Sequence, residues 1–289
     1  MCWQAHKLSA VIIDFHTHIF SDEMRARRSE YLERDAWFST LYEDPKHRLA
    51  SAEELVDSMD KAGVDRTVVF GFPWRDGGLC REHNNYLLDA ISRFPNKLIG
   101  FACVQPLDAK DAQELERCLK AGLMGLGELG PDGQRFDIED KRILAASAEV
   151  LQQYDRPLLT HSSEPMGHDY PGKGKTLPWK LLKMVQNFPN LKIVLAHWGG
   201  GLPFYELMPE IREATRNVYY DTAASTYLYR FDIFPVAARM VGADRILWGT
   251  DWPLLSQSKF MARVRASGLT EEEQTAILGG NAARLLRLD

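Results

Sequence analysis

Cysteine is scarce in this sequence, and its placement excludes several kinds of site. The 289 residues contain four cysteines, at Cys2, Cys80, Cys103 and Cys118. No two of them form a Cys-x-x-Cys pair, so neither a zinc knuckle nor a redox motif is indicated. A disulfide scaffold is not expected in a chain of this size, and we expect reduced thiols in a cytoplasmic protein.

Long hydrophobic runs are also missing, and the charge is nearly balanced. The apolar run 11–15 is too short for a signal peptide or a membrane span. Lysine and arginine number 35 against 40 aspartates and glutamates, which gives a formal net charge of −5. Such a chain lacks the excess of basic residues that is typical of nucleic-acid binders. We therefore expect a small-molecule substrate, with neither a nucleic-acid nor a membrane partner.

Apolar residues make up 45% of the chain, which is enough for a globular core. They form eight runs that are mostly continuous, as in strands of a parallel sheet covered on both faces. The expected strands are 11–16, 66–72, 97–106, 122–128, 156–161, 191–197, 217–222 and 244–251. The expected helices between and after them are 51–63, 81–94, 108–121, 139–154, 176–188, 229–241, 258–267 and 270–287.

Eight alternating β and α units predict an α/β fold, a (β/α)8 TIM barrel, as a single domain over residues 1–289. An open doubly wound sheet is the alternative, but it normally carries a glycine-rich phosphate loop after its first strand. Residues 16–23 follow the first strand here and contain no glycine. Segment 19–50 is long for a βα loop and rich in charged and aromatic residues, so we expect it to cover the active site.

Six ligand-type residues lie at or near the ends of predicted strands: His16, His18, Glu128, His161, His197 and Asp251. The carboxyl ends of barrel strands form the rim where active sites are built, so these side chains are expected to converge. His16 and His18 stand at i and i+2 of one strand and therefore face the same side. Two imidazoles aimed into one barrel mouth can chelate a divalent ion.

Imidazole and carboxylate donors without sulfur suit Zn²⁺, which we expect first, and also Mn²⁺, Fe²⁺ or Co²⁺. The expected metal ligands are His16, His18, Glu128, His161 and Asp251. Two of them have simpler alternatives. Asp251 precedes Trp252-Pro253 and also suits a helix N-cap, and His161 also suits a core histidine.

His197 precedes Trp198 and the glycine run 199–201, which lets the backbone turn sharply or approach a ligand closely. We expect His197 to polarise the substrate or to transfer a proton beside the metal, with a metal-ligand role as the alternative. The candidates for substrate contact are Arg75, Lys173, Trp198 and Trp252. Each of them also fits a solvated charge or a packing side chain.

The segments VIIDFHTHIF, GLGELG, LLTHSSEP, KIVLAHWGGGLPFYE, NVYYDTAAS and RILWGTDWPL follow one another along the chain. Together they resemble the amidohydrolase superfamily, most of all the branch with carboxymuconate-semialdehyde and aromatic-acid decarboxylases. The resemblance implies a metal-dependent barrel with ligands at His16, His18, His161 and Asp251 and a catalytic His197. Glu128 lies in a context similar to TatD-like nucleases, where a glutamate binds metal. A homodimer is expected from the resemblance alone.

The leading hypothesis is metal-assisted hydrolysis of a small amide, ester or lactone that carries a carboxylate. The ion would bring the pKa of a bound water to about 7. Asp251 would accept its proton, and His197 would hydrogen-bond the carbonyl oxygen. The alternative is a metal-dependent non-oxidative decarboxylase of an aromatic or muconate-type acid, with Asp251 or His197 protonating carbon. A glycosidase using Glu128 and Asp221 ranks low, because it leaves four histidines without a role.

Overall fold

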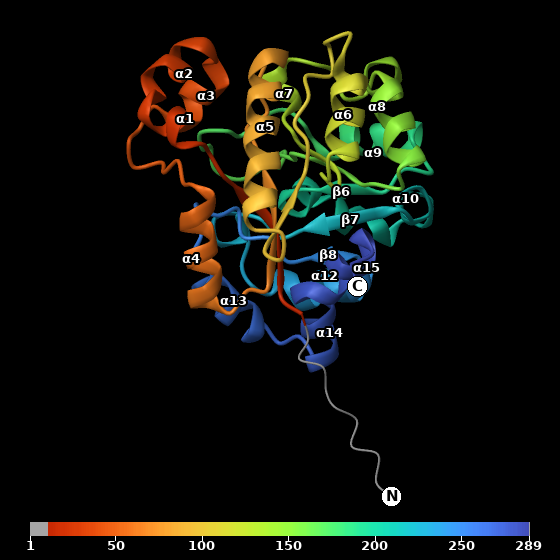
Figure 1. Cartoon of the computed structure of the whole chain (residues 1–289). Helices are drawn as coiled ribbons and strands as arrows, with labels where there is room; N and C mark the ends of the chain where they lie inside the picture. Colours follow the sequence, from red (N-terminus) through yellow and green to blue (C-terminus); the bar gives the residue numbers. More distant parts are fainter. Residues whose placement is uncertain (1–10, 289) are drawn as a thin grey trace, which may run out of the picture.

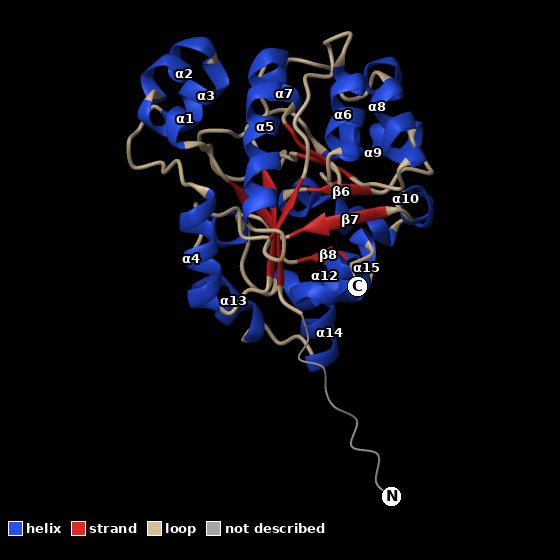
Figure 2. Ribbon diagram, in the orientation of Figure 1, coloured by secondary structure: helices blue, strands red, loops and turns tan. Residues whose placement is uncertain are grey.

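The computed structural model describes residues 11–288, with strands at the centre and helices around them (Figures 1 and 2). The strands are β1 (Ile13–His18), β2 (Arg66–Phe70), β3 (Leu98–Gly100), β4 (Leu126–Leu129), β5 (Leu158–Thr160), β6 (Ile193–Leu195), β7 (Val218–Asp221) and β8 (Ile246–Leu247). Each strand overlaps the apolar run that predicts it, although most are shorter than the run.

The strands form a closed barrel from two sheets that are joined at two places. All pairs are parallel and in chain order, within one sheet of β1–β3 and a second of β4–β8. Bridges between Thr17 and Trp252 and between Ala102 and Leu126 join the two sheets at both sides. The backbone N–H of His18 also donates to the carbonyl of Trp252 at 2.8 Å. The predicted (β/α)8 barrel is therefore confirmed.

Helices surround the barrel close to their predicted positions. The longer ones are α4 (Ala52–Ala62), α5 (Gly77–Arg93), α6 (Asp111–Lys120), α8 (Lys141–Gln153), α9 (Pro178–Asn187), α12 (Ile233–Val241) and α13 (Gln257–Arg265). The shorter ones are α7 (Pro131–Gln134), α10 (Pro209–Ala214), α11 (Ser225–Leu228), α14 (Glu271–Thr275) and α15 (Asn281–Leu286), with η1 (His197–Leu207), η2 (Ala243–Arg245) and η3 (Ala276–Gly280). None of the described helices is long and apolar enough to cross a membrane.

The last predicted helix, 270–287, is interrupted by the π-helical segment η3 between α14 and α15. A Cβ atom on Gly279 would collide with the carbonyl oxygen of Val11, so the backbone here packs directly on the chain that enters β1. A regular helix pattern in the sequence does not reveal such a contact. The close packing explains why glycine occupies this position.

Segment 19–50 forms three short helices rather than a loop: α1 (Asp22–Ala26), α2 (Arg28–Arg34) and α3 (Ala36–Tyr42). They stand as a separate group beside α5 in Figure 1. The Phe38 ring packs against Phe72 and Trp74, at centroid distances of 5.0 and 4.8 Å. Phe72 and Trp74 follow β2, so the helices rest on the carboxyl-end rim of the barrel. Their role as an active-site cover stays a prediction.

The barrel interior holds an aromatic layer below the rim. The rings of Phe15 and Phe70 each meet Phe101 edge-on, at 5.8 and 5.4 Å. The register of β1 against β2 shifts between Asp14 and Thr17, a β-bulge that bends the strand. His16 follows Phe15 directly, yet its ring also meets Phe70, at 5.1 Å. The bulge therefore lets consecutive residues face the interior.

Three of the predicted thiols, Cys80, Cys103 and Cys118, are buried and unbridged, as expected. Cys2 lies outside the described residues. The Sγ atoms of Cys80 and Cys103 lie 3.4 Å apart in the packing beneath α1–α3. Burial raises the pKa of Cys80 well above its usual value, so this thiol stays protonated.

Candidate metal centre

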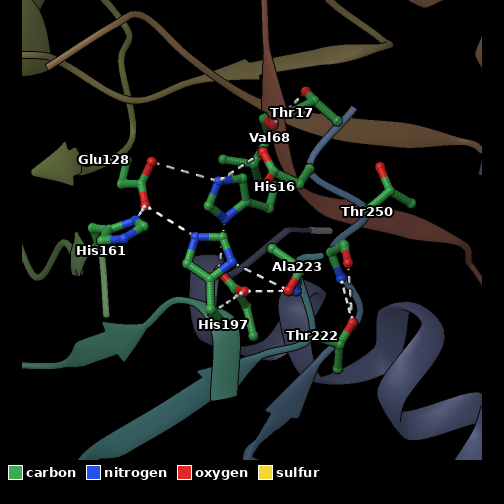
Figure 3. A network of polar contacts seen from close by, with 12 residues as sticks. His16, Thr17, Val68, Glu128, His161, His197, Thr222, Ala223 and Thr250 are labelled. Atoms are coloured by element: carbon green, nitrogen blue, oxygen red, sulfur yellow. Dashed lines mark hydrogen bonds and ion pairs between the residues drawn. The ribbon is translucent and has the colours of Figure 1, made fainter. Parts of the chain in front are cut away.

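The structure brings all six predicted ligand-type residues together at the carboxyl ends of the strands. Figure 3 shows Glu128, His161 and His197 grouped around His16, with dashed lines from Glu128 to each imidazole. They come from β1, β4 and the segments that follow β5 and β6. The convergence that strand spacing predicts is thus present.

Four donor atoms lie at metal-ligand separations. The Nε2 atoms of His16 and His18 are 3.1 Å apart. Glu128 Oε2 lies 3.7 Å from His16 Nε2 and 3.6 Å from His18 Nε2. Asp251 Oδ1 lies 3.7 and 3.5 Å from the same two atoms. Ligand atoms about 2.1 Å from one ion lie about 3.0–4.2 Å apart, depending on the angle between them, so the cluster fits a divalent cation.

Both β1 imidazoles are oriented by hydrogen bonds from their other ring nitrogen. His16 Nδ1 donates to Asp221 Oδ2 at 2.8 Å, and His18 Nδ1 donates to the carbonyl of Gly71 at 3.3 Å. These bonds place the proton on Nδ1 and leave the Nε2 lone pair for a metal. Among the described residues, the possible ligand groups are His16–His18–Asp251 and His16–Glu128–His197. The two groups share His16.

Asp221 supports the site rather than acting in it. It is fully buried, and its Oδ1 accepts the backbone N–H groups of His197 at 3.1 Å and Ala223 at 2.9 Å. Its Oδ2 is taken by His16. The glycosidase hypothesis needs this carboxylate at a substrate, so the structure argues against it.

His161 provides a further available donor. Its Nδ1 lies 3.1 Å from Glu128 Oε1. Its Nε2 is buried and has no hydrogen-bond partner among the described residues. Buried polar atoms of this kind normally have a partner, so the unpaired nitrogen fits a residue that binds a metal or a substrate. This argues against the core-histidine alternative.

Carboxylates dominate the electrostatics of the cluster. Burial lowers the pKa of His16, but three carboxylates raise it to about 9: those of Asp221, Glu128 and Asp251. Burial and the neighbouring His16 together lower the pKa of His18. Burial raises the pKa of Glu128, and the surrounding imidazoles outweigh this and lower it well below its usual range. A buried pocket with this much negative charge favours a cation.

His197 is held at both ends of its ring. Nδ1 donates to the carbonyl of Ala223 at 3.2 Å, and Nε2 lies 3.5 Å from Glu128 Oε1. Burial lowers its pKa, but the Glu128 hydrogen bond and the Asp251 charge raise it to about 10. The backbone is left-handed here, with φ of 54° at His197. A Cβ atom on Gly200 would collide with the carbonyl of Ser163, so the glycine run is needed for close packing.

Asp251 is positioned by backbone contacts, not by a helix. Its N–H donates to the carbonyl of His16 at 2.8 Å, and its φ of 64° is left-handed. Helix α13 begins later, with Ser256 as its N-cap residue, so the N-cap alternative for Asp251 is wrong. The preceding Thr250 is fixed by the buried Asp14, which accepts its N–H at 2.9 Å and its hydroxyl at 2.6 Å.

The four residues predicted to contact the substrate lie in different surroundings. Trp198 is fully buried, donates to Ser225 Oγ at 2.7 Å and packs on Phe234. It is therefore a core residue and not the predicted substrate contact, because its ring is fully covered and its N–H is already paired. Lys173 Nζ donates to three loop carbonyls, those of Met166, Gly167 and His168, at 2.9–3.3 Å.

Arg75 is exposed, and Trp252 is buried beside the bridge that joins β8 to β1. Their substrate contacts, and that of Lys173, stay predictions. Tyr42, at the end of α3, was not singled out by the sequence. Its ring packs against Phe20 at a centroid distance of 5.5 Å, and burial and the charges of Asp251 and Glu128 raise its pKa. The aromatic content of 19–50 indicated the segment but not the residue.

Comparisons with known proteins identify the family. A family model described as Amidohydrolase matches residues 13–288. This chain belongs to the amidohydrolase family. The predicted resemblance is thereby confirmed, as is an enzyme of amidohydrolase type, either a hydrolase or a carboxy-lyase.

Three relatives span most of the chain. Gamma-resorcylate decarboxylase from Rhizobium radiobacter is 26% identical, covering 86% of this chain and 91% of that protein. The 2-amino-3-carboxymuconate-6-semialdehyde decarboxylase of Dictyostelium discoideum is 24% identical, covering 77% and 71%. The L-fucono-1,5-lactonase of Burkholderia ambifaria is 22% identical, covering 96% of both chains.

Solved structures share the fold. The 5-carboxyvanillate decarboxylase of Sphingomonas paucimobilis has a TM-score of 0.81 at 20% identity, covering 97% of this chain and all of that one. The dihydroxybenzoic acid decarboxylase of Polaromonas, solved with bound manganese and the inhibitor 2-nitroresorcinol, has a TM-score of 0.75 at 22% identity, covering 96% and 97%. These matches extend over nearly the whole barrel.

Proposed function

We propose that the protein is a metal-dependent, non-oxidative decarboxylase of a small hydroxylated aromatic acid. The observation that carries the proposal is the buried donor cluster of His16, His18, Glu128 and Asp251, with His197 beside it. The decarboxylases among the relatives support this reaction more than the hydrolysis that the sequence first favoured.

His16, His18, His161 and Asp251 would hold the divalent cation, with Glu128 beside it as a further ligand. When bound, the cation would supply positive charge that holds the substrate carboxylate and an adjacent ionised hydroxyl in place. Zn²⁺ was the first expectation, whereas manganese is bound in the Polaromonas enzyme. A mixed imidazole and carboxylate set accepts either ion, and metal analysis of the purified protein distinguishes them.

A residue of the chain itself would donate the proton that replaces the carboxylate on the ring. With a pKa near 10, His197 carries a proton at neutral pH, and its Nε2 is the proposed donor. The ring carbon that bears the carboxylate takes this proton. The bond to the carboxylate then breaks, its electron pair restores the aromatic ring, and CO₂ leaves. His197 regains a proton from solvent, so each turnover converts one aromatic carboxylate and one proton into one arene and one CO₂.

Aromatic side chains pack together in the segment that follows the β1 ligands, and we propose that Tyr42 among them contacts a planar substrate. The Tyr42 ring meets Phe20 and Phe72 at centroid distances of 5.5 and 6.0 Å. Phe20 follows His18 by two residues, so it lies next to the β1 ligands along the chain. Such rings pack favourably against an aromatic ligand. A homodimer and a cytoplasmic location stay predictions.

The test is product analysis with a matched panel. The metal-loaded protein is incubated in D₂O with 2,6-dihydroxybenzoate, 5-carboxyvanillate and a sugar lactone. We expect CO₂ from an aromatic acid and one deuterium at the vacated ring carbon. His197→Gln should keep its bound metal and lose at least 100-fold in rate, within the usual range for a general acid. Lactone hydrolysis without CO₂ release would refute the proposal.

Lactone hydrolysis is the second candidate. The lactonase relative covers 96% of both chains. The Asp251 side chain is 18% exposed, so it is open to a water molecule at the cluster. In this case Asp251 would act as the general base, and acid release in the same panel would identify the reaction.

A further inference from the structure

Glu164 lies three residues after His161 and presents an oxygen without a partner. Its Oε2 accepts the Tyr170 hydroxyl at 2.9 Å. Its Oε1 is buried and has no hydrogen-bond partner within the described part of the chain. Carboxylate oxygens removed from water are normally paired, so this one indicates a donor supplied by a ligand.

The loop that carries Glu164 is well fixed. The backbone N–H of Ser163 donates to the carbonyl of Thr176 at 2.9 Å, and the N–H of Gly174 donates to Ser163 Oγ at 3.0 Å. The Lys173 ammonium stabilises the same loop by donating hydrogen bonds to three of its carbonyls. Glu164 is therefore held in place, as a residue that selects a ligand must be.

The side chain faces other elements of the active-site rim. Burial and the charge of Glu164 raise the pKa of Tyr229, a residue that follows β7. Tyr229 stands over the glycine run beyond His197, since a Cβ atom on Gly201 would lie 3.5 Å from its hydroxyl. Burial, Glu164 and the more distant Asp251 raise the pKa of Tyr170. The neighbouring Ser163 lies against the glycine run, since a Cβ atom on Gly200 would collide with its carbonyl. The loop that carries Glu164 therefore borders the segment that follows His197.

We propose that Glu164, positioned by Tyr170, determines specificity by accepting a hydrogen bond from a hydroxyl or amino group of the substrate. The inference rests on the proposed function and narrows its substrate class. The preferred acid carries a donor group in addition to the hydroxyl next to its carboxylate. A second carboxylate at this position is disfavoured, because two like charges repel.

Non-reacting analogues test the inference without turnover. Calorimetry on the metal-loaded protein compares 2-nitroresorcinol with 2-nitrophenol, which lacks one hydroxyl. We expect the wild type to bind 2-nitroresorcinol about 10- to 100-fold more tightly, as for a hydrogen bond to a charged group. Glu164→Leu should reduce the preference below about threefold. Glu164→Gln keeps an amide oxygen as acceptor and should retain part of it, and the exposed Glu149→Gln should leave it unchanged.

The outcomes separate the two proposals. Equal binding of the two analogues, binding of neither, or an unchanged preference in Glu164→Leu would overturn the role of Glu164. If CO₂ is still released in that case, the proposed function stands without a role for Glu164. Discrimination that depends on Glu164 in a protein that releases no CO₂ would instead support this site and reject the decarboxylase.

Discussion

The Nδ1–H of His16 donates to Asp221 Oδ2 at 2.8 Å, between residues that are 205 positions apart in the chain. The bond links β1 to β7 across the barrel mouth and directs His16 Nε2 toward the donor cluster. The same carboxylate accepts the N–H of His197, so it orients two histidines of the site. Geometry of this kind tunes a metal site through residues that do not touch the ion.

Asp221→Asn tests this support. Its amide nitrogen would donate to His16 Nδ1 and force the ring proton onto Nε2, where the metal must bind. We expect metal affinity to fall about 10- to 100-fold while the fold is retained. Titration against a competing chelator measures the change. The exposed Glu210→Gln serves as control, and an Asp221→Asn variant with normal affinity would contradict the assigned role.

Gly249→Ala should displace His16 by a steric clash. An added Cβ at Gly249 would lie 2.7 Å from the Cβ of His16, closer than packed atoms tolerate. We expect weaker metal binding and lower activity, measured by metal content after dialysis. Gly268→Ala is the matched control, because no atom within 4 Å would meet its Cβ. It should lose stability alone, by about 1 kcal/mol, because its φ is positive.

Metal affinity should rise with pH. His16 has a pKa of about 9 and must lose its proton before Nε2 can bind an ion. Between pH 7 and pH 9 we expect the apparent affinity to increase about tenfold per pH unit and then to level off. Glu128→Gln removes one of the negative charges that raise the pKa of His16. In this variant the metal affinity should therefore level off at a lower pH. A pH-independent affinity in the wild type would contradict the charge balance of the site.

His83 should make stability sensitive to acid. It is fully buried, its Nε2 donates to the Ile19 carbonyl at 2.7 Å, and Nδ1 accepts from Trp74 Nε1 at 3.0 Å. Burial lowers its pKa from 6.5 to about 4. As pH falls below 6.5 the unfolded chain takes up a proton that the folded chain refuses, so stability is lost.

The loss amounts to about 2 kcal/mol between pH 7 and pH 5. Urea unfolding at both pH values measures it. His83→Gln should be less stable at pH 7, because the imidazole packing is lost, but its free energy of unfolding should change less between the two pH values. The exposed His47→Gln should behave like the wild type. Equal acid sensitivity in His83→Gln and the wild type would refute this explanation.

The sequence predicted the barrel well, because most strands lie within continuous apolar runs and helical stretches separate these runs. In α4, a capping box of Ser51 and Glu54 begins the helix and the left-handed Gly63 ends it. Strand lengths could not be predicted, since they depend on where the neighbouring strands end. The helices within 19–50 were missed because charged and aromatic residues alternate there without a long helical pattern.

The convergence of the candidate ligands could be predicted where strand geometry decides it, whereas their roles stay predictions. His16 and His18 converge as the i, i+2 rule requires. Trp198 was misplaced because the left-handed backbone at His197 and Trp198 cannot be derived from the order of the residues. The role of Asp221 follows from its hydrogen bond with His16, which the sequence does not show. The proposed role of Glu164 follows from a buried oxygen without a hydrogen-bond partner among the described residues. Such features arise from tertiary packing alone.

The most direct test is CO₂ release from 2,6-dihydroxybenzoate before chelation, after chelation and after the return of Mn²⁺ or Zn²⁺. We expect release from the metal-loaded protein, its loss with the metal, and its recovery when the ion is restored. His16→Ala should not recover under the same treatment. Turnover that persists after complete removal of the metal would contradict the account.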